Sequence, residues 1–177
     1  MSQEALSIAI LAALTLAAAV LAALAVRLPG RLEDRAAQAL RLACRFALAA
    51  VFLAAAYGKL RDPYAFAVSI HAYRLTPASW ATIGAVAMPA IEVAAALAVA
   101  SGLCWRGGAV VLIGLLLVFI VGLGQAIVRG IDIECGCFGE GSSPVSYWLI
   151  ARNYLLIIAA LVPLAYARRR DQGGLAA

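Results

Sequence analysis

Five long apolar runs divide this sequence, and they constrain its fold more than any other feature. They cover residues 6–26, 42–60, 80–100, 105–128 and 147–166. A helix needs about 20 predominantly apolar residues to cross a hydrocarbon core of roughly 30 Å. Each run meets that length, so we predict an all-α integral membrane bundle of five transmembrane helices.

The composition supports this class. Hydrophobic residues make up 66% of the 177 residues and the mean hydropathy is +0.98, whereas soluble domains are roughly 45–50% apolar. The length allows one domain. The net charge of +5 does not indicate nucleic-acid binding, because the arginines stand between apolar runs rather than in a continuous basic stripe.

The first run is predicted to be a retained transmembrane span. The segment "MSQEALS" before it has no basic residue, and the run is longer than the roughly 7–15 residues of a secretory signal core. We expect an additional N-terminal helix with a cytoplasmic loop at 1–40, a four-helix transmembrane core at 41–166 and a cytoplasmic tail at 167–177.

The basic residues orient the bundle, because lysine and arginine prefer the cytoplasmic side. The first and third loops and the C-terminus together hold eight of them: Arg27, Arg31, Arg35, Arg41, Arg106, Arg168, Arg169 and Arg170. The opposite face holds four: Lys59, Arg61, Arg74 and Arg129. This predicts a bacterial inner-membrane protein with its N-terminus and fourth loop outside and its C-terminus in the cytoplasm.

A short helix is predicted in "RDPYAFAVSIHAYRL", between the second and third spans. Asp62 has the character of an N-cap and Pro63 suits the first helical position. Phe66, Ile70 and Tyr73 then fall on one stripe. We expect this helix to lie at the outer membrane interface.

The fourth loop contains the motif with the clearest chemistry, Cys135-Gly136-Cys137. An extracytoplasmic location permits disulfides, and glycine most readily takes the conformation that a bridge this small requires. Such a bridge restricts the unfolded chain very little, and strained, exposed bridges exchange readily. We therefore interpret the pair as a catalytic site for thiol–disulfide exchange, which would make the protein a thiol–disulfide oxidoreductase.

Two other interpretations of this pair remain open. Two thiolates can hold a soft ion such as copper or mercury, which would indicate a metal-binding or transport protein. Zinc is disfavoured, because structural zinc needs four ligands and His71 is distant in the chain. Alternatively, the cysteines are inert and the protein is a non-catalytic assembly subunit of a membrane oxidoreductase.

Cys44 and Cys104 fall near the cytoplasmic ends of the second and fourth runs. They are candidates for a second thiol pair that relays electrons across the membrane. The favoured interpretation is simpler, because free cysteine usually packs as a small buried hydrophobe.

Glu92 lies near the middle of the third run, three residues after Pro89. An ionised carboxylate there costs at least about 2.5 kcal/mol, so Glu92 needs a partner, and Arg45 and Arg152 are the cations we consider. One hypothesis makes Glu92 a proton acceptor linked to thiol oxidation. The other, slightly favoured, makes it part of a buried ion pair that fixes helix register.

Four polar residues project near the outer boundary and are predicted to form a floor beneath the cysteine loop: Lys59, Gln125, Arg152 and Asn153. For Lys59 the commoner alternative is a side chain that extends to the interface and keeps its ammonium group in water.

Four segments together resemble the MauE/DoxX family of redox-associated membrane proteins: "RFALAAVFLAAAYGKLRDPYAF", "AMPAIEVAAALAVASG", "CGCFGEGSSPVS" and "ARNYLLIIAALV". The likeness covers about residues 41–163, and "CGCFG" is its most specific part. The additional first span makes the chain similar to the five-span MauE branch rather than to the four-span DoxX branch.

The resemblance implies a role in forming or transferring disulfides during maturation of exported proteins, notably the small subunit of methylamine dehydrogenase, with a thioredoxin-like partner. Cys135 and Cys137 would be the redox pair, and Lys59, Glu92 and Arg152 would be polar signature residues. An electron acceptor is then required. A membrane quinone is the natural candidate, although no sequence motif identifies a site for it.

Overall fold

The computed structural model describes residues 3–27, 34–75, 77–131 and 145–174. In these ranges it contains six helices, and five of them are long and apolar enough to cross a membrane. The prediction of an all-α membrane bundle with five spans and one short helix is confirmed. The helices are α1 (Gln3–Arg27), α2 (Asp34–Arg61), α3 (Pro63–Ala72), α4 (Ala78–Ser101), α5 (Trp105–Val128) and α6 (Tyr147–Gly174).

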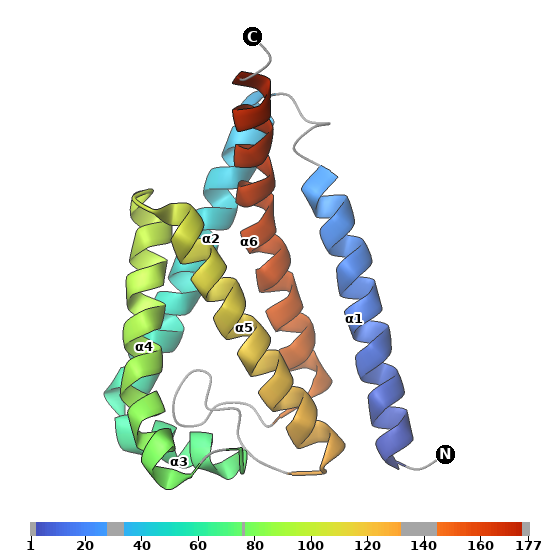
Figure 1. Cartoon of the computed structure of the whole chain (residues 1–177), viewed down its shortest axis with the longest axis vertical. Coiled ribbons are helices and arrows are strands. Elements are labelled where there is room, and N and C mark those ends of the chain that lie inside the picture. Colours follow the sequence, from blue (N-terminus) through green and yellow to red (C-terminus); the bar gives the residue numbers. More distant parts are fainter. Residues whose placement is uncertain (1–2, 28–33, 76, 132–144, 175–177) are drawn as a thin grey trace.

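Four helices form the body of the bundle. Helix α2 packs against α4 and α6, and α5 packs against the same two helices, so that the four close into a ring. Helix α1 lies outside this ring along α6 and α5 (Figure 1). Among the described side chains of α1 only Ser7 is buried, which makes α1 a peripheral helix.

The two ends of the bundle differ. Helix α3 lies across one end, where α5 finishes and α6 begins; we call this the α3 end (Figure 1). The connection from α4 to α5 and the C-terminus lie at the opposite end, which we call the C-terminal end. Ile131 and Val145, the described residues on either side of 132–144, are therefore both at the α3 end.

The core of the ring is apolar and tightly packed. Leu48 and Phe52 of α2 meet Val99 of α4 and Leu112 and Leu116 of α5, all of them almost fully buried. Large apolar side chains on the outside of the helices are exposed in the isolated chain. That outward-facing apolar surface is what a bilayer solvates in a membrane protein.

Two helix boundaries differ from the prediction. Helix α2 begins at Asp34 rather than near residue 42, and α6 continues to Gly174 through most of the segment predicted as a tail. The added segments, "DRAAQAL" and "ARRRDQ", contain no proline and are rich in alanine, arginine and glutamine, which favour helix. Hydrophobicity marks where a helix enters lipid, but helix propensity decides where it ends.

The short helix α3 begins as its sequence predicts. The Asp62 carboxylate accepts a hydrogen bond from the backbone N–H of Ala65 at 2.8 Å, and Pro63 occupies the first turn. Phe66 is buried while Tyr64 is exposed. The helix therefore presents its apolar stripe to the bundle and covers the α3 end.

Candidate functional site

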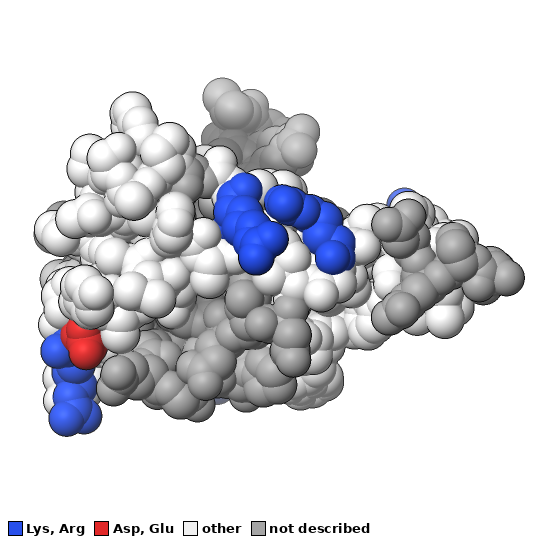
Figure 2. All heavy atoms as spheres, turned by 90° about the horizontal axis from the view of Figure 1, so that it is seen from below, with Lys and Arg blue, Asp and Glu red and all other residues white. Residues whose placement is uncertain are grey.

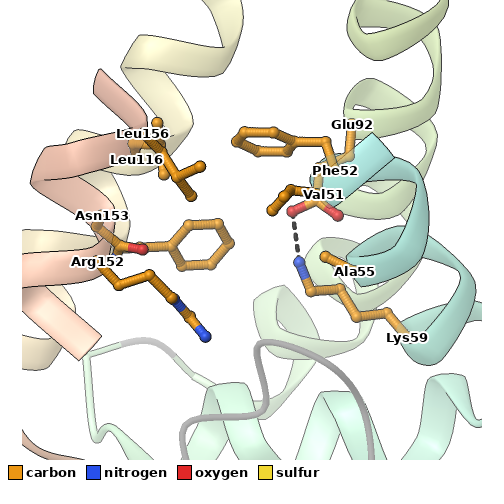
Figure 3. A pocket seen from close by; sticks show the side chains of 10 residues that line it. Val51, Phe52, Ala55, Lys59, Glu92, Leu116, Arg152, Asn153 and Leu156 are labelled. Carbon is orange, nitrogen blue, oxygen red and sulfur yellow. Dashed lines mark hydrogen bonds and ion pairs between the residues drawn. The ribbon is translucent and has the colours of Figure 1, made fainter. Parts of the chain in front are cut away.

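A cavity lies inside the ring on the side of the α3 end, and four polar side chains line it: Lys59, Glu92, Arg152 and Asn153 (Figure 3). The rest of its wall is apolar and comes from α2, α5 and α6. The volume that the centre of a water molecule can occupy in this cavity is about 30 Å³. Because roughly 10–15 Å³ suffices for one molecule, the cavity has room for about two ordered waters.

Lys59 and Glu92 form a buried ion pair across α2 and α4, in which the ammonium donates a hydrogen bond to Oε1 of Glu92. Their side chains are 1% and 0% exposed. Side chains on a helix lean toward its N-terminus. Since α2 and α4 run in opposite directions (Figure 1), Lys59 leans into the bundle and Glu92 leans toward the α3 end, so that the two groups meet.

This pairing corrects two interpretations from the sequence. The salt bridge of Glu92 is with Lys59, and not with Arg45 or Arg152. Lys59 does not extend to the interface either, because its side chain turns inward to the carboxylate (Figure 3). Counting residues along each span gave an approximate depth for Lys59 but not the direction of its side chain.

Two aromatic rings complete the surroundings of Lys59. Its ammonium lies 5.3 Å from the ring centroid of Phe66 on α3 and 4.8 Å from that of Phe119 on α5. Cations are attracted to ring faces at such distances, more strongly where water is excluded. Sequence reasoning missed Phe119, because no spacing relative to Lys59 signals a contact between different helices.

Glu92 and Asn153 each have one buried side-chain atom without a hydrogen-bond partner within the described structure. These atoms are Oε2 of Glu92, an acceptor, and Nδ2 of Asn153, a donor. Glu92 is fully buried, and Asn153 is 3% exposed. Unsatisfied buried polar groups are rare in native proteins and call for a ligand or water. These two atoms belong to side chains that line the same cavity.

Gln125 lies apart from this cavity, although it was predicted to join the same polar floor. Its side-chain amide donates to the backbone carbonyl of Tyr73 at 2.9 Å and accepts from Arg129 at 2.9 Å. These bonds tie the end of α5 to the segment that follows α3. Burial raises the pKa of the Tyr73 hydroxyl to about 12.

Arg45 lies toward the C-terminal end of the bundle. Its guanidinium donates two hydrogen bonds, of 3.1 Å and 2.7 Å, to the backbone carbonyl of Val99 near the end of α4. It also lies 5.5 Å from the ring of Trp105. The last four carbonyls of a helix have no intrahelical partner. Arg45 therefore caps α4 and takes no part in the cavity.

Basic side chains lie at separate places on the face of the α3 end, which Figure 2 views directly. Arg61, Arg74 and Arg129 are exposed and belong to this end.

The predicted redox pair, Cys135 and Cys137, lies outside the described residues, as does the 132–144 segment that contains it. The other two cysteines are free thiols: Cys44 is half-buried and Cys104 is exposed. No disulfide joins them in the described structure. The expectation that both pack as buried hydrophobes is wrong for Cys104, which precedes α5 with a φ of 49°.

The charged groups of the cavity allow proton exchange. Oε1 of Glu92 accepts from the Lys59 ammonium, Oε2 is buried without a hydrogen-bond partner within the described structure, and the side chain lines the cavity, so this carboxylate is a candidate to receive a proton from a molecule held there. The cavity walls limit water to the few molecules that fit. In such an enclosed, weakly hydrated setting a carboxylate forms stronger hydrogen bonds and electrostatic interactions with polar groups than it does in water.

Five spanning helices, four of them closed around a buried lysine–glutamate pair, define a multi-pass helical membrane protein. The family model described as methylamine utilisation protein MauE matches residues 37–166, which include α3, α4 and α5, nearly all of α2, and α6 as far as residue 166. The chain belongs to this family, and the resemblance noted in the sequence is confirmed.

One relative shows how far the similarity extends. A protein of Paracoccus denitrificans described as methylamine utilization protein MauE is 36% identical over 121 residues. The match covers 67% of this chain and 65% of that protein, so the chain spans slightly less than two thirds of its relative's length. No solved structure matches the chain.

Proposed function

We propose that this protein is an accessory membrane protein of methylamine utilisation or a related pathway, and that it supports disulfide formation or transfer in exported proteins. The relative is named for methylamine utilization, and the family match covers the four-helix ring apart from the first residues of α2 and the end of α6. The reactive pair is Cys135 and Cys137. Its partner is a thioredoxin-like protein or an exported client that carries disulfides.

The observation that carries this proposal is that the described residues on either side of the Cys-Gly-Cys segment, Ile131 and Val145, lie at the same end of the bundle as the cavity. The segment connects α5 to α6, and both of its described flanks are at the α3 end. The buried Lys59–Glu92 pair faces a cavity on the same side of the bundle. A proton-accepting group at the end of the bundle where the thiol-bearing connection begins and ends suits this function, because each disulfide formed releases two protons.

The proposal also includes the orientation. The protein would lie in the bacterial inner membrane with the α3 end outside and the C-terminus in the cytoplasm. Under this arrangement the cysteine segment stands in a compartment where disulfides persist. The exposed arginines of the α3 end would then lie at the outer headgroup level.

Redox trapping in intact cells tests the proposal. A membrane-impermeant maleimide is applied before lysis, and a permeant one afterwards. We expect Cys135 and Cys137 to be found partly oxidised and to react from outside once reduced. A Cys137→Ser variant should capture a mixed disulfide with a partner through Cys135. The Cys44→Ser and Cys104→Ser double variant is the matched control and should behave as wild type.

Three outcomes would contradict the proposal. The first is a pair that remains reduced in cells and captures no mixed disulfide. The second is binding of copper or mercury that depends on both cysteines in the purified protein, which would indicate metal handling. In the third, Cys135→Ser and Cys137→Ser together leave the host pathway fully active, which would make the protein an assembly subunit.

A further inference from the structure

The cavity at Lys59 and Glu92 has a neighbour. A second cavity, of about 90 Å³ on the same measure, lies between α3, α4 and α5, with Phe66, Tyr73, Met88 and Phe119 in its wall. Phe119 lines both cavities. The ring that faces the Lys59 ammonium at 4.8 Å is thus a shared wall, and its rotation would join the two spaces.

The second cavity is accessible from the lipid side of the bundle. Two of its lining residues, Leu75 and Val118, are each 56% exposed. Val118 lies on the outer surface near the middle of α5. Exposed surface at that depth of a spanning helix faces hydrocarbon rather than water. A molecule that reaches the ion pair by this route therefore has to be soluble in the bilayer.

The far end of the route is polar. Glu92 Oε2 can accept a hydrogen bond and Asn153 Nδ2 can donate one, and both lack partners within the described structure. The rings of Phe52 and Phe119 line the same space, and aromatic rings favour offset stacking with flat partners. The site thus favours a molecule that dissolves in lipid, has a flat ring and carries polar groups. A lipid-soluble molecule with oxygen atoms attached to a flat ring meets all three conditions.

We infer that the two cavities form one binding site for the head group of a membrane quinone, with Phe119 as its movable wall and Glu92 and Asn153 as its polar end. In the present conformation the inner cavity has room for water alone, so binding requires the Phe119 ring to turn toward the second cavity. The isoprenoid tail would leave beside Val118 into the lipid.

The electrons and protons of thiol oxidation and quinone reduction balance. The direction of electron flow, from thiols to quinone, rests on the proposed function. Oxidation of two cysteine thiols to a disulfide releases two electrons and two protons. Reduction of a quinone to its hydroquinone takes up the same number. Asn153 would donate to a carbonyl oxygen of the quinone, and Glu92 would exchange a proton with the hydroxyl of the hydroquinone.

Photolabelling of the full-length chain in lipid nanodiscs tests the site. The probe is an azido-quinone, competed with decylubiquinone, and labelled peptides are located by mass spectrometry. We expect competable label near Phe119 on α5 and near Asn153 on α6. Asn153→Leu should weaken competition by about tenfold, as loss of one buried hydrogen bond predicts. Leu155→Ala, a lipid-facing change on the same helix, is the matched control.

A second variant keeps the test decisive if Asn153→Leu folds poorly. Phe119→Ala removes the shared wall and should speed labelling several-fold, whereas Val121→Ala on the lipid face of α5 should not. Label spread over lipid-facing side chains without competition would overturn the inference, as would equal competition in wild type and Asn153→Leu. The Cys135→Ser and Cys137→Ser double variant should still be labelled, which separates failure of the site from failure of the thiol chemistry.

Discussion

Helix α2 carries two buried basic side chains, and the protein accommodates them in opposite ways. Toward the C-terminal end, Arg45 donates both of its described hydrogen bonds to one carbonyl of α4. Toward the α3 end, Lys59 pairs with a carboxylate whose second oxygen has no partner within the described structure and belongs to a side chain lining a cavity. The first arrangement uses its polar groups to complete a helix end, whereas the second leaves one available for a ligand.

The contrast separates a structural charge from a functional candidate. Both groups are costly to bury in a bilayer, and burial alone does not distinguish them. What distinguishes them is the hydrogen-bond inventory. Arg45 stabilises the C-terminus of α4, where a positive charge also complements the helix dipole. The Lys59–Glu92 pair adjoins space that a second molecule can occupy.

Breaking the Lys59–Glu92 pair should have the largest effect. Lys59→Met leaves a carboxylate buried without its cation and should lower the free energy of unfolding by about 3–5 kcal/mol, measured by titration with SDS. Adding Glu92→Leu should restore most of that stability, because an apolar pair of similar volume is often neutral. Oxidation of Cys135 and Cys137 should stay impaired in the double variant. Normal oxidation there would show that the pair is merely structural.

Arg45→Met should have a smaller effect on stability. It removes two charge-assisted hydrogen bonds to Val99 and should lower the free energy of unfolding by about 2–3 kcal/mol. Arg45→Lys keeps the charge with a less suitable donor geometry. It should lower the free energy of unfolding by about half as much. Thiol oxidation per folded molecule should stay unchanged in both. A selective loss of oxidation at full stability would give Arg45 a functional role.

Packing around the Arg45 end can be tested at a glycine. A Cβ on Gly108 would lie 2.8 Å from the backbone carbonyl oxygen of Ala95, whereas one on Gly114 would meet no atom within 4 Å. Gly108→Ala should therefore push α4 and α5 apart and lower stability by about 1–3 kcal/mol. Gly114→Ala is the matched control and should be neutral or stabilise by up to about 1 kcal/mol. Similar results at both positions would argue against close α4–α5 packing here.

The smallest effect concerns pH at the α3 end. Burial raises the pKa of Tyr73 to about 12, above the value near 10 of an unfolded chain. Between these values the folded protein retains a proton that the unfolded chain has lost, so stability is complete below pH 10 and falls as pH rises toward 12. Thermal unfolding between pH 9 and 12 should reveal this decline. Tyr73→Phe should flatten it, and an unchanged slope would contradict it.

Much of the architecture was predictable because it depends on local pattern. The five spans and the capped start of α3 at Asp62 and Pro63 follow from run length and from residue preferences at a helix start. Helix ends were less predictable. Helix α2 begins at Asp34 and α6 continues to Gly174, because polar helix formers extend a helix beyond its apolar part.

The candidate site was predictable only in part. The sequence indicated that Glu92 needs a partner and that Lys59, Arg152 and Asn153 lie toward one boundary, and these four residues do line one cavity. It did not identify Lys59 as the partner, nor exclude Gln125 from the group. Those details depend on which faces of neighbouring helices meet, and residues on different helices have no fixed spacing in the chain.

By itself the sequence determined that this protein has five helices long and apolar enough to cross a membrane, since the thickness of the hydrocarbon core sets how many consecutive apolar residues each helix needs. It also placed the chain in its family. The tertiary structure alone decided which buried charges pair and which remain open to a cavity. The physical reason is that side chains lean toward the start of their own helix, so the antiparallel packing of α2 and α4 brings Lys59 and Glu92 together.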